Sequence, residues 1–274
     1  MNRIKKTLNP IHNKHKKKRL DLLLCERKLV ESRNKAQAVI LAHQVIVSDT
    51  ITGQPVPNHI LKPGSVFPEN IHIQIKLLCP YVSRGGTKLE SALKYWEVNV
   101  SDKTCLDIGS STGGFSDCLL QYGAKKIYAV DVGRGQMHPK LRNDPRVQLE
   151  EETHVLMWNP PWKIDRIQNE IPSFITVDVS FLSLKKILSR IPELFNLKLK
   201  IQFEILALIK PQLEVGPQFL KKGIVRDPEI RAQCIIEILE YSKNLHYTLI
   251  DHFPSPILGM KGNQEEWVYL KFIK

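Results

Sequence analysis

Two charged side chains follow apolar runs at positions where they could move a proton. Asp178 comes directly after Phe174–Val177, and Lys210 comes directly after Ile205–Ile209. The carboxyl ends of parallel strands meet at the ligand-binding edge of an open α/β sheet, so both residues are expected at that edge. A lysine beside a carboxylate suits acid–base chemistry. A structural ion pair would explain the two residues equally well, and their positions alone leave both interpretations open.

A candidate ligand loop lies earlier in the chain. The run Thr104–Phe115 predicts a buried strand that contains Asp107, then a tight turn and the start of a helix. Three glycines in this run, Gly109, Gly113 and Gly114, let the backbone turn and let a ligand approach. The next strand, Ile127–Val130, ends in Asp131. Acidic residues after the first two strands of a βαβ unit suit a ligand with ribose hydroxyls.

The residues of this loop favour one nucleoside cofactor over another. A dinucleotide fingerprint requires G-x-G-x-x-G, but Ser111 stands at the second glycine and Asp107 precedes the first. A carboxylate there would repel a pyrophosphate, whereas it tolerates an amino-acid tail and a sulfonium. The loop therefore predicts S-adenosylmethionine rather than NAD. A tight strand–helix turn without any ligand is the alternative.

Composition limits the class of protein and its location. The 274 residues suit one large domain, or a large and a small one. No apolar run approaches the roughly 18 residues of a membrane span. The five cysteines include no C-x-x-C pair and the histidines lack metal-ligand spacing, so we expect no disulfide framework, no metal and a cytoplasmic protein.

Positive charge is concentrated at the N-terminus. Residues 1–77 contain fourteen Lys and Arg against five Asp and Glu, although the net charge of the whole chain is only +12. A segregated basic block is typical of proteins that bind nucleic acid. Residues 1–18, which hold seven basic and no acidic residues, are predicted to form a disordered arm. A merely solvating tail is the alternative for this arm.

The next segment predicts a small domain with two helices and short strands. Ser32 is expected to cap the second helix, which places Arg33 and Lys35 in its first turn. The helix dipole disfavours cations there, and a bound phosphate would resolve the conflict. Residues 19–77 resemble the αL RNA-binding domain named after the fourth small-subunit ribosomal protein, although His43 stands where a glycine is usual. Residues 78–85 are interpreted as a linker.

Strands and helices alternate over residues 86–274. Continuous apolar strands separated by helices predict an α/β fold with a mostly parallel, doubly wound sheet. A last strand at Trp267–Phe272, whose direction the sequence leaves open between parallel and antiparallel, would complete a Rossmann-like sheet of the class I methyltransferase type.

Seven motifs in order carry a resemblance to a known family. They are Tyr81-Val-Ser-Arg-Gly-Gly-Thr-Lys88, Asp107-Ile-Gly-Ser-Ser-Thr-Gly-Gly-Phe115, Asp131-Val-Gly-Arg-Gly-Gln, Asp178-Val-Ser-Phe-Leu-Ser, Lys210-Pro-Gln, Gly223-Ile-Val-Arg-Asp-Pro and Gly262-Asn-Gln-Glu265. With the N-terminal domain, they make the chain similar to the TlyA family (hemolysin A-like proteins), whose catalytic domain resembles FtsJ-type RNA methyltransferases. The resemblance implies S-adenosylmethionine-dependent 2′-O-methylation of ribosomal RNA, usually at cytidine, with ribosomal RNA or subunits as partners.

The resemblance also implies a catalytic tetrad of Lys88, Asp178, Lys210 and Glu265. A ribose hydroxyl is a poor nucleophile, so its proton must leave as the oxygen attacks the methyl group. Lys210 is expected to activate the oxygen and Asp178 to orient Lys210 and the methyl group, while Lys88 and Glu265 position the ribose. The sequence leaves open which of the two lysines removes the proton. Burial and the neighbouring ammonium of Lys88 would favour a neutral Lys210, whereas the carboxylates oppose this.

Further residues are assigned to binding. The cofactor candidates are Asp107, Gly109, Ser110, Ser111, Gly113, Gly114, Phe115, Asp131, Val132 and Asp178, and the RNA candidates are Lys16, Lys17, Lys18, Arg19, Arg33, Lys35 and Arg84. The adenine contact is left open between Glu151 and Glu152, because His154 replaces the family's usual Asn and a residue is inserted before it. Strand alternation allows only one of Glu265 and Glu266 to face the site.

Two other hypotheses compete with the enzyme. A non-catalytic ribosome-assembly factor could retain the cofactor pocket, but it would not need all four tetrad residues. Membrane lysis, suggested by the hemolysin name, lacks a spanning segment or a strongly amphipathic basic helix in this sequence. A monomer is favoured, although the sequence leaves the oligomeric state open.

Overall fold

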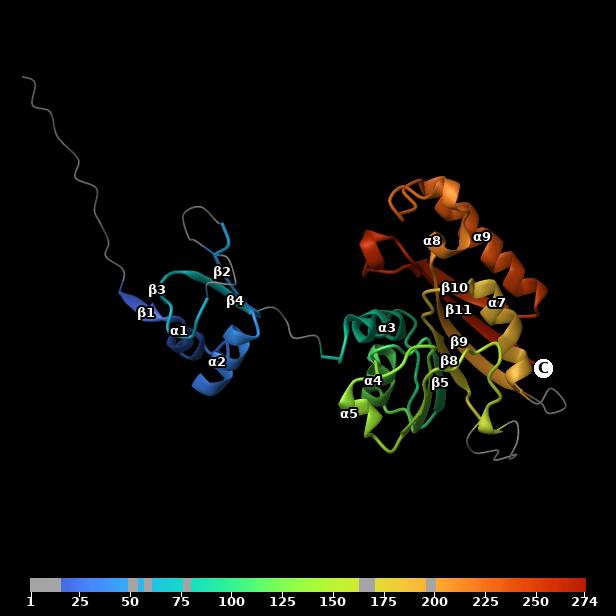
Figure 1. Cartoon of the computed structure of the whole chain (residues 1–274), viewed down its shortest axis with the longest axis horizontal. Coiled ribbons are helices and arrows are strands. Elements are labelled where there is room, and N and C mark those ends of the chain that lie inside the picture. The colour runs from blue at the N-terminus through green and yellow to red at the C-terminus, as the bar shows by residue number, and fades with distance from the viewer. Residues whose placement is uncertain (1–15, 49–53, 57–60, 76–79, 163–170, 196–200) are drawn as a thin grey trace, which may run out of the picture. The chain divides into compact units, whose positions relative to one another are not determined.

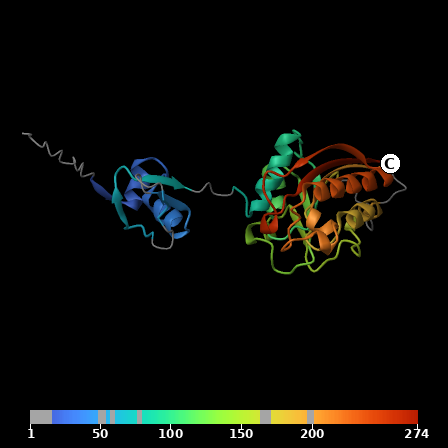
Figure 2. The ribbon, with the colours of Figure 1, turned by 90° about the horizontal axis from the view of Figure 1, so that it is seen from above.

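The computed structural model describes residues 16–48, 54–56, 61–75, 80–162, 171–195 and 201–274 (Figures 1 and 2). The chain divides into two compact units, residues 1–78 and 79–274. The first is an N-terminal unit of helices and short strands, and the second is built on a seven-stranded sheet.

The N-terminal unit packs two helices against two small antiparallel sheets. The strand β1 pairs with β3, and β2 pairs with β4. Its core consists of apolar residues from both helices and the strands around them, such as Leu20, Leu24, Val39 and Val47. The element bounds are β1 Lys17–Arg19, α1 Leu20–Glu26, α2 Arg33–Leu41, β2 Val45–Ser48, β3 Val66–Pro68 and β4 His72–Ile75.

Local details of this unit follow from its sequence, with one difference. The Ser32 side chain accepts a hydrogen bond from the Lys35 amide, as an N-cap does. His43 adopts a left-handed φ of 54° where a glycine was usual. Lys17 and Lys18 were assigned to a disordered arm but lie in β1, because β1 pairs with β3 and the Lys18 ammonium lies 2.7 Å from Glu26 and 3.0 Å from Glu69. Residues 1–15 of the predicted arm lie outside the described residues.

The second unit is built around one mixed sheet with the strand order β10-β11-β9-β8-β5-β6-β7. All pairs from β9 to β7 are parallel, while β11 is antiparallel to both β9 and β10. This confirms the predicted Rossmann-like, mostly parallel sheet and shows that its last strand is antiparallel. The strands are β5 Thr104–Ile108, β6 Lys126–Val130, β7 Val147–Glu150, β8 Phe174–Val177, β9 Gln202–Ile209, β10 Thr248–Pro254 and β11 Glu266–Ile273.

Helices cover both faces of this sheet (Figures 1 and 2). Residues of α3, α4 and α5 share one apolar cluster with the sheet, and residues of α7 and α9 share the other. Alternation along each strand sends successive side chains into these two clusters, as a sheet buried on both faces requires. The helices are α3 Arg84–Tyr95, α4 Gly114–Gln121, α5 Pro139–Arg142, α7 Leu184–Arg190, α8 Pro211–Glu214 and α9 Pro228–Asn244, with short 3₁₀ turns η3 Ile191–Leu194, η4 Pro217–Phe219 and η5 Met260–Gly262.

The predicted linker of residues 78–85 ends inside folded structure. Arg84 and Gly85 form the first turn of α3, and the Tyr81 side chain is buried. The reason is close packing at Gly86, where a β-carbon would lie 2.2 Å from the Tyr81 ring. The residues that begin α3 are therefore part of the second unit rather than a spacer.

Candidate active site

The β5–α4 loop runs against the end of β8. Gly109 has a φ of +85°, and a β-carbon there would lie 2.6 Å from the Asp178 carbonyl oxygen. Gly113 has a φ of +90°, and its β-carbon would collide with Leu141 and Met137. Both glycines are therefore required by backbone conformation and by close packing. Gly109 brings the loop directly beside Asp178, whereas Gly113 fixes the loop from behind and lines neither cavity described below.

Asp107 does not reach the cavity, contrary to its prediction as a cofactor ligand. Its side chain lies on the face of β5 that α4 covers, and it is fully buried. The Ser116 hydroxyl donates to one carboxylate oxygen at 2.7 Å, and the Thr176 hydroxyl donates to the other at 3.0 Å. Burial raises the pKa of the Asp107 carboxyl to about 6, although these hydroxyls oppose the shift. Asp107 holds β5, α4 and β8 together.

Asp131 organises the loops at the end of β6. Its carboxylate accepts hydrogen bonds from the Ser111 amide at 2.9 Å and from the Gly133 amide at 2.7 Å. The side chain remains half-exposed and lines a cavity, so its remaining lone pairs can accept further hydrogen bonds. Val132, also predicted, is exposed and lines the same cavity.

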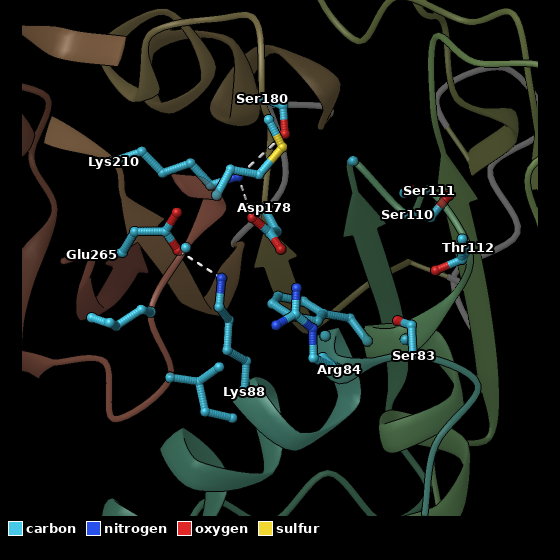
Figure 3. A pocket seen from close by; sticks show the side chains of 18 residues that line it. Ser83, Arg84, Lys88, Ser110, Ser111, Thr112, Asp178, Ser180, Lys210 and Glu265 are labelled. Carbon is cyan, nitrogen blue, oxygen red and sulfur yellow. Dashed lines mark hydrogen bonds and ion pairs between the residues drawn. The ribbon is translucent and has the colours of Figure 1, made fainter. Parts of the chain in front are cut away.

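Two cavities meet at the carboxyl ends of β5 and β8. The larger one, of about 570 Å³, is bordered by apolar side chains such as Val130, Val179 and Leu182. The smaller one, of about 290 Å³, contains the charged side chains shown in Figure 3. Gly109, Ser111, Asp178 and Ser180 line both. The remaining predicted cofactor residues Ser110, Gly114 and Phe115 line the smaller cavity.

The four predicted tetrad residues line this smaller cavity together. The Lys88 ammonium lies 2.6 Å from a Glu265 carboxylate oxygen, and the Lys210 ammonium lies 2.5 Å from an Asp178 carboxylate oxygen. Figure 3 shows Lys88 and Glu265 pointing toward one another, and Lys210 pointing toward Asp178 and Ser180. Exposed fractions of 12% for Lys88 and 2% for Glu265 mean that water screens this pair little.

Polar groups around the tetrad leave capacity for a ligand. The Ser180 hydroxyl accepts a long hydrogen bond of 3.4 Å from Lys210. The Ser110 hydroxyl is buried, lines the smaller cavity and has no hydrogen-bond partner within the described part of the chain. The contact of Asp178 with Lys210 is a close ion pair without hydrogen-bond alignment. Buried polar atoms of this kind are normally satisfied, so a bound polar ligand is expected here.

The two adjacent glutamates face different surroundings. Glu265 faces the cavity and receives a further, long hydrogen bond of 3.4 Å from the Gln212 side chain. Glu266 instead lies 2.7 Å from the Nδ1 atom of His252. Of the two, Glu265 is therefore the one available to a ligand.

The predicted RNA-binding residues fall into distinct settings. In the N-terminal unit, Asp21 is fully buried and binds Arg33 at 3.0 Å and Arg19 at 2.9 Å. Hydrogen bonds from Arg19 and then from Arg33 hold the pKa of the Asp21 carboxyl far below its usual range. Asp21 therefore supplies the anion that we expected a phosphate to supply at Arg33. Lys16 and Lys35 are exposed in that unit, whereas Arg84 lines the smaller cavity of the second unit.

Several residues that line the cavities were missed. Ser180 and Phe181 follow Asp178 in a motif that was identified, so their place could have been inferred. The wall Ile257–Met260 carried no such signal, because it is an irregular loop. For the adenine contact, Thr153, His154 and Val155 line the larger cavity, whereas Glu151 pairs with Arg142 at 2.7 Å.

The described residues show neither a membrane-spanning helix nor a metal-binding cluster. No helix there is long and apolar enough to cross a membrane. No group of three or more His, Cys, Asp or Glu side chains in those ranges could hold a metal ion.

Comparisons with known proteins agree with this geometry. A family model described as FtsJ-like methyltransferase matches residues 81–272. The "Putative rRNA methyltransferase YqxC" of Bacillus subtilis is 43% identical over 257 residues, which cover 93% of this chain and 86% of that protein. "Hemolysin A" of Brachyspira hyodysenteriae is 39% identical, with 90% and 97% covered. The "16S/23S rRNA (cytidine-2′-O)-methyltransferase TlyA" of Mycobacterium tuberculosis is 34% identical, with 92% and 89% covered.

Two solved structures are also similar. A "Putative hemolysin from Streptococcus thermophilus" is 35% identical with a TM-score of 0.67, and the alignment covers 93% of this chain and 88% of that one. A "putative hemolysin from Lactococcus lactis" is 42% identical with a TM-score of 0.65, covering 71% and 89%.

Proposed function

This chain belongs to the TlyA and hemolysin A group of the FtsJ-like methyltransferase family, and on that premise we propose that it methylates a ribose 2′-hydroxyl of ribosomal RNA. Relatives whose names state a reaction are rRNA (cytidine-2′-O)-methyltransferases, so a cytidine is the proposed target. One observation carries the proposal: two lysine–carboxylate pairs line a cavity that opens into a second, more apolar one. Ribosomal RNA as substrate places the reaction in the cytoplasm.

S-Adenosylmethionine is the proposed methyl donor, and it supplies a methyl group activated by a positively charged sulfur. The residues fit such a group. Ser110 offers a buried hydroxyl without a partner, and Gly109 leaves room where any side chain would collide. Val132 and Asp131 border the larger cavity. There the Val132 side chain can pack against the face of the adenine base, and the Asp131 carboxylate can accept hydrogen bonds from the ribose hydroxyls. His154 lies at the same cavity and offers its ring to a base.

Lys210 and Asp178 handle the proton in this proposal. The 2′-oxygen forms a bond to the methyl carbon as the carbon–sulfur bond breaks, and the hydroxyl proton passes to a base. A neutral Lys210 amine can accept that proton, after which Asp178, at 2.5 Å, stabilises the ammonium. The same ion pair fixes the direction of the Lys210 side chain, and Asp178 lines both cavities.

Lys88 and Glu265 position the ribose. Their pair is nearly buried, so the geometry of the two side chains is well defined. The Glu265 carboxylate can accept a hydrogen bond from a ribose hydroxyl, and the Lys88 ammonium can donate one to an oxygen. Holding the hydroxyl in line with the methyl group lowers the barrier by orientation.

The N-terminal unit is proposed to be an αL RNA-binding domain. Two helices and short strands around an apolar core support this, together with exposed basic residues at β1 and at the start of α2. The Asp21 carboxylate holds the Arg19 and Arg33 side chains in place. Each guanidinium keeps further donors for a phosphate.

A non-catalytic assembly factor is the alternative, and methyl transfer distinguishes it. We would incubate the full-length chain with labelled S-adenosylmethionine and ribosomal subunits that lack the modification. Label at one nucleotide that resists alkaline cleavage establishes 2′-O-methylation. In the Lys210→Ala variant we expect turnover to fall by about 10²-fold or more, with cofactor affinity little changed. The exposed Lys186, on α7, provides the control variant Lys186→Ala.

Two outcomes would contradict the proposal. Cofactor binding without methyl transfer to any subunit or RNA would favour the assembly factor. Full activity in Lys210→Ala would remove Lys210 from the chemistry and leave the ion pair with a structural role.

A further inference from the structure

Two lysine–glycine turns lie next to each other beside the smaller cavity. In the first, the residues Lys221 and Ile224 exchange backbone hydrogen bonds around Lys222 and Gly223. In the second, the Asn263 amide donates to the Met260 carbonyl around Lys261 and Gly262. All four central residues have positive φ, at 56° and 78° in the first turn and 58° and 85° in the second. Both therefore have the φ values of a type I′ turn.

A buried asparagine joins the two turns. The Asn263 side chain is 2% exposed. Its amide nitrogen donates to the carbonyls of Gly223 at 2.9 Å and Met260 at 3.0 Å, and its oxygen accepts from the Val225 amide at 3.2 Å. The Lys261 ammonium lies against the first turn, 3.1 Å from where a β-carbon of Gly223 would be. The two turns, and with them Lys222 and Lys261, are therefore held next to each other on one surface.

This surface borders the catalytic cavity. Met260, the residue before Lys261, lines the smaller cavity together with Ile257, Leu258 and Gly259. A β-carbon on Gly259 would lie 1.9 Å from a Glu265 carboxylate oxygen, so the loop rests directly on the tetrad. A substrate strand that reaches the tetrad must pass close to this loop.

The charge of the surface is not neutralised locally. Residues 215–226 and 253–264 contain no Asp or Glu, but they contain Lys221, Lys222, Arg226 and Lys261, all exposed. Among the described residues, no ion pair joins the three lysines to a carboxylate. The neighbouring carboxylates have other partners, since Glu265 pairs with Lys88, Glu214 accepts hydrogen bonds from Ser183 and Leu184, and Asp227 accepts one from the Glu229 amide at the start of α9.

Lys222 and Lys261 both have a left-handed backbone conformation. A left-handed residue other than glycine, asparagine or aspartate is unfavourable, and Lys222 and Lys261 are two of the nine left-handed residues other than glycine in the described part of the chain. We propose that Lys222 and Lys261 form a clamp for the phosphodiester backbone of the RNA beside the target nucleotide. The clamp rests on the proposed function, and it would read charge rather than base sequence.

Binding of a labelled ribosomal RNA transcript to the full-length chain, measured over a range of salt concentrations, tests the clamp. For Lys222→Ala and Lys261→Ala we expect affinity to fall about fivefold each near 0.15 M salt, with the slope of log K against log salt reduced by about 0.7 to 0.9 per lysine. The value of kcat at saturating RNA and the cofactor affinity should stay unchanged. Lys125, exposed in the turn before β6 and thus at the opposite edge of the sheet, provides the control Lys125→Ala.

Glycine variants separate the clamp from a structural role. Because glycine accepts a left-handed φ without strain, Lys222→Gly and Lys261→Gly should keep or raise Tm while they weaken RNA binding as much as alanine. Lys222→Arg should restore most of the affinity, since it restores the charge.

Failure of the clamp differs from failure of the proposed function. If the wild type transfers methyl groups but the lysine variants keep the wild-type salt slope, the clamp is wrong and the function stands. Loss of cofactor affinity in the lysine variants would also overturn the clamp, because the lysines would then serve the cofactor. If the variants lose slope while the wild type transfers no methyl group, the RNA surface is supported and the methyltransferase proposal is wrong.

Discussion

The Lys88 ammonium and the Glu265 carboxylate lie 2.6 Å apart, although 177 residues separate them in the chain. Lys88 comes from the second turn of α3, and Glu265 directly precedes β11. Breaking a nearly buried pair of this kind leaves an uncompensated charge. In the proposed mechanism it would also release the ribose.

Glu265→Gln tests this positioning role. We expect kcat/KM for RNA to fall by about 10²-fold or more, because orientation and a charged hydrogen bond are lost together. Glu266→Gln is the matched control, since Glu266 contacts His252 and neither residue lines the smaller cavity. Steady-state kinetics with the same RNA for both variants decides the point. Equal losses in the two would contradict a specific role for Glu265.

Gly109→Ala tests the contact between the loop and Asp178. A β-carbon at 2.6 Å from the Asp178 carbonyl oxygen must push the backbone apart, so we expect lower stability and weaker cofactor binding. Gly135 also has a positive φ, at +65°, but nothing lies within 4 Å of its β-carbon position. Gly135→Ala should therefore lose only the roughly 1 kcal/mol of the backbone conformation and keep cofactor affinity. Chemical denaturation measures the stability of the two variants, and calorimetric titration with S-adenosylmethionine measures their cofactor affinity. Equal losses of stability and affinity in the two variants would contradict the importance of the contact.

Asp107 predicts a pH dependence of stability. Burial raises the pKa of its carboxyl to about 6 in the folded chain, above the value of 3.8 in the unfolded chain. The folded state thus binds the proton of Asp107 more tightly than the unfolded state does. The contribution of this proton to the free energy of unfolding is fully present below pH 4 and is lost as pH rises through 6. The whole effect is of the order of 3 kcal/mol.

Asp107→Asn removes this titration. The free energy of unfolding of the variant should vary less than that of the wild type between pH 4 and 7, and the variant should gain relative stability at the upper end. Urea denaturation at several pH values gives the difference. A difference between variant and wild type that is the same at all pH values would show that Asp107 does not titrate there.

Asp21 predicts the opposite pH dependence of stability in the N-terminal unit. Hydrogen bonds from Arg19 and Arg33 lower the pKa of its carboxyl, so the stabilisation is present above pH 4 and is lost as the solution becomes more acidic. Asp21→Asn should remove about 2 to 4 kcal/mol at neutral pH, because two arginines lose their buried partner. Hydrogen exchange of α1 and α2 amides measures this. Glu31→Gln, at an exposed position, should leave the exchange rates unchanged.

Much of the second unit could be predicted because its strands are continuous apolar runs with a charged residue at their ends. Asp178 and Lys210 were located in this way, since both directly follow such strands. Helix α3 was missed, although Leu89, Ala92 and Leu93 have helical spacing, because Gly85 and Gly86 at its start resemble a loop. Gly86 is required by its contact with the Tyr81 ring, which only the folded chain reveals.

The cofactor assignments show where sequence reasoning reaches its limit. Asp131 directly follows the last residue of its strand, and its side chain lines the larger cavity. Asp107 lies one residue before the end of β5, and alternation turns its side chain toward α4 rather than toward the ligand edge. The wall Ile257–Met260 depends on the conformation of a loop, for which no periodic pattern exists.

The position of β11 has a consequence for the order of folding. Strand β10 precedes β11 in the chain, but β11 is its neighbour in the sheet and separates it from β9. Strand β10 therefore joins the sheet only through β11, whose pairing with β9 is a non-local contact. Glu265 immediately precedes β11, so the same step brings it to Lys88. Completion of the sheet and assembly of the charged cavity are thus one event, and folding intermediates that lack β11 should be inactive.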